Sequence, residues 1–303
     1  MEQFHLFKNN ADNFLYFTEY KQLFMITNEE YNVLKQNVNK IDIQTIINNY
    51  IDKLNKIDLS NGLEYEKIQK YGLFLCISNI CNCECSYCFA NQGNYGKEKG
   101  LMNYEIAKKS IDNFLQIVPS NINANIIFFG GEPLMNYNLI VKICNYIKEY
   151  YRDRKCIYSI VTNGTLLNKE MIDFFAENNF VVALSIDGGK EIQDTQRPLS
   201  NGKSSYDEII TNLFYLLNSV KSTHARGTYV DFNKSLVQSY KDLISLGFKE
   251  VDIPPNFILN MDVDIYTKLI NEQLDELYMF ILEYINQNDN FPFGLFRESI
   301  RNI

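Results

Sequence analysis

Residues 76–89 read C-I-S-N-I-C-N-C-E-C-S-Y-C-F and hold five of the seven cysteines in this chain of 303 residues. Three of them, Cys81, Cys85 and Cys88, follow the spacing C-x-x-x-C-x-x-C, which lets one short loop bring three thiolates to a single metal centre. A structural zinc site takes four ligands, commonly as two pairs, and this sequence contains no second pair. An iron-sulfur cluster with three thiolate ligands leaves one iron open. We therefore predict an open iron-sulfur site, with zinc binding or free thiols as the alternatives.

The other four cysteines are expected to lie outside that site. Cys83 could join the same three thiolates only by displacing a neighbour, so we expect its side chain to point away. Cys76 lies within an apolar run, and Cys144 and Cys156 also occur in apolar patterns, which predicts buried structural thiols. A clustered and odd number of cysteines fits a reducing compartment better than a disulfide framework.

Composition narrows the class of protein. With 46% hydrophobic and 22% charged residues, the chain can bury one large core or two modest ones. Its net charge of −8 argues against nucleic acid as a partner, because phosphate binding needs a concentrated basic face. The first residues do not resemble a signal peptide, and no apolar run reaches the roughly 18 residues of a membrane span. We expect a cytoplasmic protein without a membrane partner.

From residue 71 onward, apolar strand patterns alternate with helical patterns, which is typical of parallel β/α construction. Six such units are predicted, and Asn103 and Asn168 are the expected caps of two of the helices. The expected strands are 73–78, 124–129, 156–162, 180–186, 225–230 and 249–253, and the expected helices are about 104–118, 137–151, 169–178, 205–220 and 236–246. In barrels of parallel strands, functional groups follow the C-terminal ends of the strands. Every unusual motif of this sequence occurs at such a position.

The cysteine stretch resembles the cluster loop of the radical S-adenosyl-L-methionine (radical SAM) superfamily. The resemblance implies an α/β fold with a partial (β/α)6 TIM-like barrel over residues 69–262, a [4Fe-4S] cluster and S-adenosyl-L-methionine chelated to the open iron. It also implies that an electron from an external donor such as a flavodoxin or ferredoxin cleaves the sulfonium. The resulting 5′-deoxyadenosyl radical then removes hydrogen from the substrate, so the cofactor supplies the difficult chemistry.

Gly130-Gly131-Glu132-Pro133 follows the second predicted strand. Glycines allow close approach of the backbone, and a carboxylate accepts hydrogen bonds from a cation. The motif resembles the G-G-E-P element of radical SAM enzymes, which contacts the amino group of the cofactor's methionine. The alternative is a tight turn from strand to helix, with the proline at the first helical position.

Two further strand ends carry Thr162-Asn163-Gly164 and Ser185-Ile186-Asp187-Gly188. They resemble T-N-G and S-I-D-G elements that line the cofactor pocket of peptide-modifying radical SAM enzymes. The resemblance therefore implies that Asn163, Ser185 and Asp187 bind the cofactor. Such residues beside glycine also form simple turns, which is the alternative.

Tyr87 and Phe89 flank the last cluster cysteine, where the family places an aromatic ring against the adenine. Packing within the loop is an equally good interpretation for Phe89. Arg226 matches an R-G-T element in which arginine can pair with the cofactor carboxylate. Arg197, before a proline, is similar to an element that would lie nearer the substrate, and its role is left open. A surface salt bridge is the alternative for both arginines.

Residues 1–68 contain three strand-like runs at 3–8, 13–18 and 22–27, then two helical patterns, the second from Ile43 to Leu54. This order resembles the small winged-helix-like segment with which peptide-modifying enzymes hold a leader peptide. An edge strand could accept that peptide by strand addition. A stabilising cap on the main domain is the alternative.

The resemblance covers about residues 70–260 and is of the peptide-maturase type, which includes thioether-forming maturases and anaerobic sulfatase-maturating enzymes. Those relatives continue into a cysteine-rich domain for auxiliary clusters, whereas residues 263–303 carry an amphipathic helix and an apolar tail without cysteine. The chain is then either a fragment or a natural short form. We favour a fragment and expect poor packing after Phe291, including Phe293 and Phe296.

The leading functional hypothesis is a radical enzyme that modifies a ribosomally made peptide or a protein, by a thioether link or by related chemistry such as formylglycine formation. A hypothesis of a different class is a peptide-binding adaptor that carries zinc or free thiols on the same fold.

Overall fold

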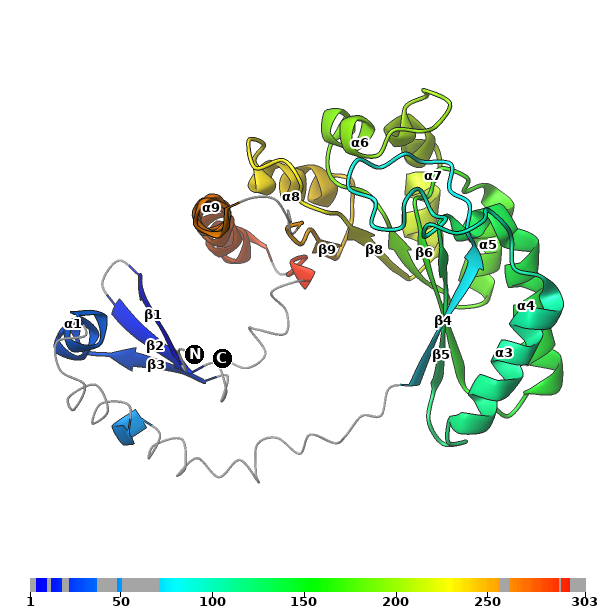
Figure 1. Ribbon diagram of the computed structural model, residues 1–303, viewed down its shortest axis with the longest axis horizontal. Coiled ribbons are helices and arrows are strands. Elements are labelled where there is room, and N and C mark those ends of the chain that lie inside the picture. Colours follow the sequence, from blue (N-terminus) through cyan, green and yellow to red (C-terminus); the bar gives the residue numbers. More distant parts are fainter. Residues whose placement is uncertain are drawn as a thin grey trace. The chain divides into compact units, whose positions relative to one another are not determined.

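The structure is a computed structural model that describes residues 4–9, 12–17, 22–36, 48–50, 71–256, 262–288 and 290–294 (Figure 1). The chain divides into two compact units, Met1–Ile68 and Gln69–Ile303.

The first unit contains a small antiparallel sheet. Its strands β1 (Phe4–Asn9), β2 (Asp12–Phe17) and β3 (Gln22–Ile26) pair in sequence order, and helix α1 (Asn28–Gln36) follows. Thr27 and Glu30 form a capping box, in which each accepts a hydrogen bond from the other's backbone N–H at the start of α1. The buried side chains are Leu15, Ile26, Tyr31, Leu34 and Tyr50. Of the predicted helix from Ile43 to Leu54, only residues 48–50 lie inside the described residues.

The second unit is built on six parallel strands. Its elements are β4 (Tyr71–Ser78), α3 (Tyr104–Ile117), β5 (Ala124–Gly130), the 3-10 turn η1 (Pro133–Asn136), α4 (Tyr137–Tyr150), β6 (Cys156–Thr162), α5 (Lys169–Glu177), β7 (Val181–Leu184), α6 (Lys190–Gln196), α7 (Ser205–Ser219), β8 (Ser222–Arg226), α8 (Leu236–Ser245), β9 (Val251–Asp252) and α9 (Val263–Gln287). The sheet order is β4-β5-β6-β7-β8-β9, and in the described part of the chain β4 and β9 do not pair. The predicted α/β fold, a partial and open barrel, is confirmed.

The predicted helix caps explain where two helices begin. Asn103 accepts a hydrogen bond from the backbone N–H of Ile106 at the start of α3, and Asn168 does the same for Met171 at the start of α5. Helix α6, between β7 and α7, was not predicted, because its seven residues carry no clear helical pattern of apolar side chains.

The two faces of the sheet differ in burial. Leu75 and Ile77 of β4 point to the helices and are buried, whereas Phe74 and Cys76 alternate with them and are exposed on the inner face. The prediction of a buried Cys76 is therefore wrong, because an open barrel leaves its inner face partly uncovered. Cys144 is buried in the core as expected, and Cys156 is half-buried.

The tail of the second unit packs tightly around one aromatic ring. Phe293 is fully buried and contacts the rings of Tyr240, Phe280 and Tyr284, with ring centroids 5.4–5.8 Å apart. The backbone N–H of Val251 in β9 donates to the carbonyl oxygen of Pro292 at 2.7 Å.

The expectation of poor packing after Phe291 is therefore wrong for Phe293, because the 290–294 segment pairs with the edge strand and fills the space between α8 and α9. Phe291 is partly buried against the same core, and Phe296 lies outside the described residues. In the ranges that the structure describes, no helix is long and apolar enough to cross a membrane.

Candidate functional site

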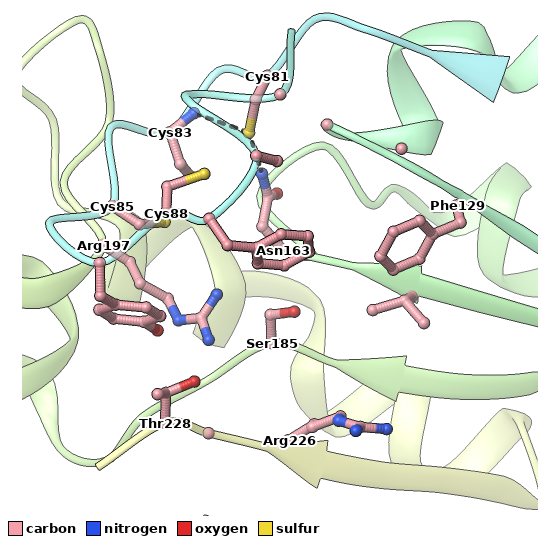
Figure 2. Close-up of a pocket in the computed structure, with 18 of the residues that line it drawn as sticks. Cys81, Cys83, Cys85, Cys88, Phe129, Asn163, Ser185, Arg197, Arg226 and Thr228 are labelled. Carbon is pink, nitrogen blue, oxygen red and sulfur yellow. Dashed lines mark hydrogen bonds between the residues drawn. The ribbon is translucent and has the colours of Figure 1, made fainter. Parts of the chain in front are cut away.

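A cavity of about 530 Å³ lies at the C-terminal ends of the strands and extends onto the inner face of the sheet. The loop after β4 forms one wall, and the ends of β5, β6, β7 and β8 form the others (Figure 2). Of the residues predicted from the sequence, the cavity is lined by Cys81, Cys85, Tyr87, Cys88, Gly130, Gly131, Asn163, Ser185 and Arg226.

The glycines after β5 hold the cysteine loop by direct backbone contact. The N–H of Gly131 donates to Ser78 O at 2.7 Å, and the next N–H along the chain donates to Ile80 O at 2.8 Å. A Cβ atom at Gly131 would lie 2.6 Å from Ile80 O and 2.8 Å from the Cα atom of Gly93. Gly93 itself has φ +94°, and its own Cβ would lie 3.1 Å from the Cβ of Cys81. These glycines are therefore required for the position of the loop.

A second segment, residues 196–200 after α6, holds the loop from the opposite side. Three hydrogen bonds of 2.8–3.0 Å join it to residues 82–86, from Glu84 N to Pro198 O, from Ser86 N to Gln196 O and from Ser200 N to Asn82 O. A β-bridge between Cys83 and Leu199 lies within this pairing. Nothing in the cysteine motif itself indicates this pairing, because its partner is more than a hundred residues away.

The three motif cysteines line the cavity, and so does Cys83, which lies between them in the sequence. Cys83 is only 2% exposed and does not point away as expected. The backbone of Cys83 pairs with Leu199, and its thiol lies within hydrogen-bond distance of the sulfurs of Cys81 and Cys85. A hydrogen bond from the Cys83 thiol lowers the pKa of both Cys81 and Cys85 to about 7 and raises the pKa of Cys83 itself.

Glu132 lies behind the cavity wall and is 1% exposed. Its carboxylate accepts hydrogen bonds from the Thr162 hydroxyl at 2.7 Å, the Asn163 N–H at 2.7 Å and the Leu134 N–H at 2.9 Å. Burial raises the pKa of Glu132 to about 7, although the three donors act in the opposite direction. Through these hydrogen bonds, the Glu132 side chain connects the end of β5 to the end of β6 and holds Asn163 in place.

Asn163, which Glu132 holds, in turn contacts the cysteine loop. Its amide Nδ2 donates to Asn82 Oδ1 at 2.9 Å and lies 3.8 Å from the sulfur of Cys81. Its own Oδ1 accepts from the N–H and hydroxyl of Thr165, which fixes the orientation of the amide. Ser185 lines the cavity at the end of β7.

Asp187, Arg197 and Tyr87 form a buried polar group on the other side of the cavity. The Asp187 carboxylate is completely buried, accepts from the Tyr87 hydroxyl at 2.6 Å and from the Thr228 N–H at 2.9 Å, and pairs with Arg197 Nη2 at 3.0 Å. The guanidinium lies 5.2 Å from the centre of the Tyr87 ring. Asp187 does not line the cavity, whereas Arg197, whose role the sequence left open, does.

The inner face of the sheet adds residues that sequence reasoning missed. Phe74, Phe129 and Val161 line the cavity from the sheet, and Thr228 lines it from the loop after β8. Phe89 of the cysteine loop, which the sequence had already indicated, lines it as well. Phe89 is 83% exposed and is therefore not part of the core, although its ring meets that of Tyr95 in the same loop edge to face, with centroids 6.1 Å apart. The period-two alternation of the strands marks these positions as sharing a face, but it does not show which face remains uncovered.

The cavity suits a three-thiolate cluster and a small charged cofactor. Cys81, Cys85 and Cys88 are half-buried on one loop, and two of the three have a lowered pKa, which favours the thiolate that a metal requires. The Nε of Arg197 is buried without a hydrogen-bond partner among the described residues, which leaves a donor available for a ligand. In the same ranges, no three Cys, His, Asp or Glu side chains already converge as a metal site.

Known proteins resemble this chain in sequence and in fold. The model of the Radical SAM superfamily matches residues 75–235. An uncharacterized protein of Methanocaldococcus jannaschii is 34% identical over 210 residues, which are 66% of this chain and 70% of that protein. A cysteine-type anaerobic sulfatase-maturating enzyme of Clostridium novyi is 35% identical over 184 residues, 58% of this chain and 46% of the enzyme, so this chain spans about half of that relative.

The solved structure of native anSMEcpe with bound AdoMet and Kp18Cys peptide has a similar fold. Its TM-score is 0.66 at 23% identity, over 75% of this chain and 64% of that one. The family model covers more than half of the chain, and the sheet and cysteine loop agree with it. The chain therefore belongs to the radical SAM superfamily, which implies a [4Fe-4S] cluster and S-adenosyl-L-methionine as its cofactors.

Proposed function

We propose that this chain is the catalytic part of an enzyme that removes a hydrogen atom from a side chain of a peptide or protein. The observation that carries the proposal is the single cavity that collects the three motif cysteines, the glycine turn and the polar ends of β6 and β7. When bound, the cluster and S-adenosyl-L-methionine supply the radical chemistry, and the residues of this chain bind, orient and shield.

Cys81, Cys85 and Cys88 would hold the cluster through their thiolates. Their loop is held from both sides, by Gly131 and by residues 196–200, so that its position is determined before any metal arrives. Asn163 restrains the Cys81 sulfur through its amide. This support explains why residues far apart in the chain belong to one site.

The cofactor would lie beside that loop. Gly130 and Gly131 line the cavity and would hold the methionine amino group, and Arg197, whose Nε has no partner among the described residues, would hold the carboxylate. Tyr87 presents its ring for the adenine and Ser185 its hydroxyl for polar groups of the cofactor. Glu132 and Asp187 would then act indirectly, as positioning residues.

The proposed substrate is a ribosomally made peptide or a protein. The matched sulfatase-maturating enzyme supports a protein substrate, and the peptide in the compared structure supports a peptide one, although that likeness concerns the fold alone. The reaction we favour is a thioether link or related side-chain modification. Formylglycine formation is the second candidate, which the likeness to a relative named as an anaerobic sulfatase-maturating enzyme, 35% identical over 184 residues, supports.

Two partners complete the proposal. A flavodoxin or ferredoxin would donate the electron, because reductive cleavage of S-adenosyl-L-methionine consumes an electron that a reductant must supply. In the first unit, β1 and β3 are the edges of the small sheet, and an edge strand could accept a leader peptide by strand addition.

The deciding experiment is anaerobic reconstitution followed by iron and sulfide analysis. We expect wild type to bind iron and sulfide and to form 5′-deoxyadenosine from S-adenosyl-L-methionine under reduction. Alanine in place of Cys81, Cys85 or Cys88 should abolish both, whereas Cys156→Ala, the matched control outside the site, should abolish neither. Zinc uptake without labile sulfide would instead favour the adaptor hypothesis and reject the enzyme.

A further inference from the structure

One arginine that lines the cavity, Arg226, has no carboxylate partner among the described residues. Arg226 ends β8 on the inner face of the sheet, is exposed and lines the cavity. Within the ranges that the structure describes, its guanidinium makes no ion pair within 4 Å and no hydrogen bond. Figure 2 shows the Arg226 side chain directed away from the cysteine loop, whereas Arg197 lies beside that loop.

The carboxylates near the cavity do not neutralise Arg226. Asp187 is already engaged by Arg197, Tyr87 and the backbone of Thr228. Asp252 is the register partner of Arg226 on β9, and its carboxylate lies against Gly294 of the tail. A cation on the wall of a cavity, without a protein carboxylate, is suited to an anionic group of a ligand.

An apolar wall belongs to the same cavity. Phe74 on β4 is 64% exposed and meets Phe129 on β5 edge to face, with ring centroids 5.9 Å apart. Val161 on β6 continues this wall across the sheet. Exposed aromatic rings inside a cavity favour an aromatic or aliphatic side chain of a ligand. The cavity therefore combines one apolar surface with one cation on a separate strand.

We propose that Arg226 is a specificity residue that binds a carboxylate of the substrate, while the wall of Phe74 and Phe129 binds an adjacent apolar side chain. The substrate class is then a peptide segment with an aromatic or aliphatic residue next to a carboxylate. That carboxylate belongs either to Asp or Glu or to a chain terminus. This inference rests on the proposed peptide substrate, and it replaces the expectation that Arg226 pairs with the cofactor, a role for which Arg197 lies nearer the loop.

The first test measures how fast phenylglyoxal modifies Arg226 in the reconstituted protein, with peptide mapping by mass spectrometry. The probes are acetyl-Phe-Glu-amide, acetyl-Phe-Gln-amide and acetyl-Phe-Gln with a free carboxyl terminus, each at millimolar concentration. We expect the Glu probe to slow modification at least about threefold, and S-adenosyl-L-methionine without reductant to leave the rate within about twofold. The free-acid probe distinguishes a terminal from a side-chain carboxylate. Protection by the cofactor, equal protection by the Glu and Gln amides, or no protection by any probe would each overturn the inference.

The second test uses Arg226→Gln and a reporter cysteine beside the apolar wall. Cys76, which is exposed on the same inner face as Phe74, reacts with N-ethylmaleimide, and bound probe should slow that reaction. We expect Arg226→Gln to weaken the Glu probe about tenfold, which is the loss of one charge-assisted interaction, and to leave the Gln probe unchanged. Equal weakening of both probes would contradict the inference. Neither readout needs turnover, so failure here is separate from failure to bind iron or to cleave the cofactor.

Discussion

The replacement Gly131→Ala tests whether the glycine turn positions the cysteine loop. The added Cβ would lie 2.6 Å from Ile80 O and 2.8 Å from Gly93 Cα, whereas ordinary contacts begin near 3.4 Å. Both neighbours are backbone atoms, so the loop itself must retreat by about 0.6–0.8 Å. Overpacking of this kind costs about 1–3 kcal/mol, and the displaced segment contains the hydrogen bond from Gly131 to Ser78.

Gly100→Ala is the matched control, because a Cβ there would meet no atom within 4 Å. We expect urea unfolding of the metal-free protein to show a free energy of unfolding lower by about 1–3 kcal/mol for Gly131→Ala, and a change within about 1 kcal/mol for Gly100→Ala. Iron per chain after anaerobic reconstitution should fall for Gly131→Ala only. If Gly131→Ala matches the control in both measurements, the close contact does not position the loop and the reasoning is refuted.

Three further predictions concern single side chains. Cys83→Ala should bind as much iron as wild type, because the cluster needs only the three thiolates of the motif and Cys83 is a fourth cysteine beside them. Iron loss as complete as in Cys81→Ala would contradict this. Because burial raises the pKa of Glu132 from 4.5 to about 7, the folded protein holds one proton more than the unfolded protein in that window. Wild type should then lose stability as pH rises from 4.5 to 7, and Glu132→Gln should lack this contribution, so equal slopes of unfolding free energy against pH would disprove the shift. Phe293→Ala should lower the free energy of unfolding in urea by about 3–5 kcal/mol. The control Phe214→Ala, at a side chain on α7 that is 82% exposed, should change it by no more than about 0.5 kcal/mol. Similar changes for the two variants would show that the tail is not packed.

Local signals of the sequence were sufficient for the order of the strands and of every helix after β4 that was predicted, whereas the short helix α6 was missed. Alternating apolar patterns and single capping residues such as Asn103 act over a few residues, so one sequence contains them fully. The spacing of Cys81, Cys85 and Cys88, and the position of each motif after a strand, likewise predicted one shared cavity.

Contacts between distant segments could not be predicted in this way. The direction of Cys83 depends on pairing with residues 196–200, and the place of Arg197 depends on the same fold-back. Exposure of Cys76 depends on how many strands close the barrel, which the alternation within one strand does not contain. Burial of Phe293 depends on the edge strand that its own backbone pairs with. Apart from the missed helix α6, each error therefore concerns which segments lie beside a residue, and not the helix or strand that contains it.

The two-sided attachment of the cysteine loop also sets an order of events during synthesis. A chain emerges from its N-terminal end, so the thiols of residues 81–88 leave the ribosome well before residues 130–132 and 196–200, which hold the loop in place. Until about residue 200 has folded, the nascent loop is an unprotected group of thiols, prone to oxidation and to capture of the wrong metal. Insertion of the iron-sulfur cluster is consequently a late step. The yield of active enzyme should therefore depend on the concentrations of oxygen and zinc around the growing chain.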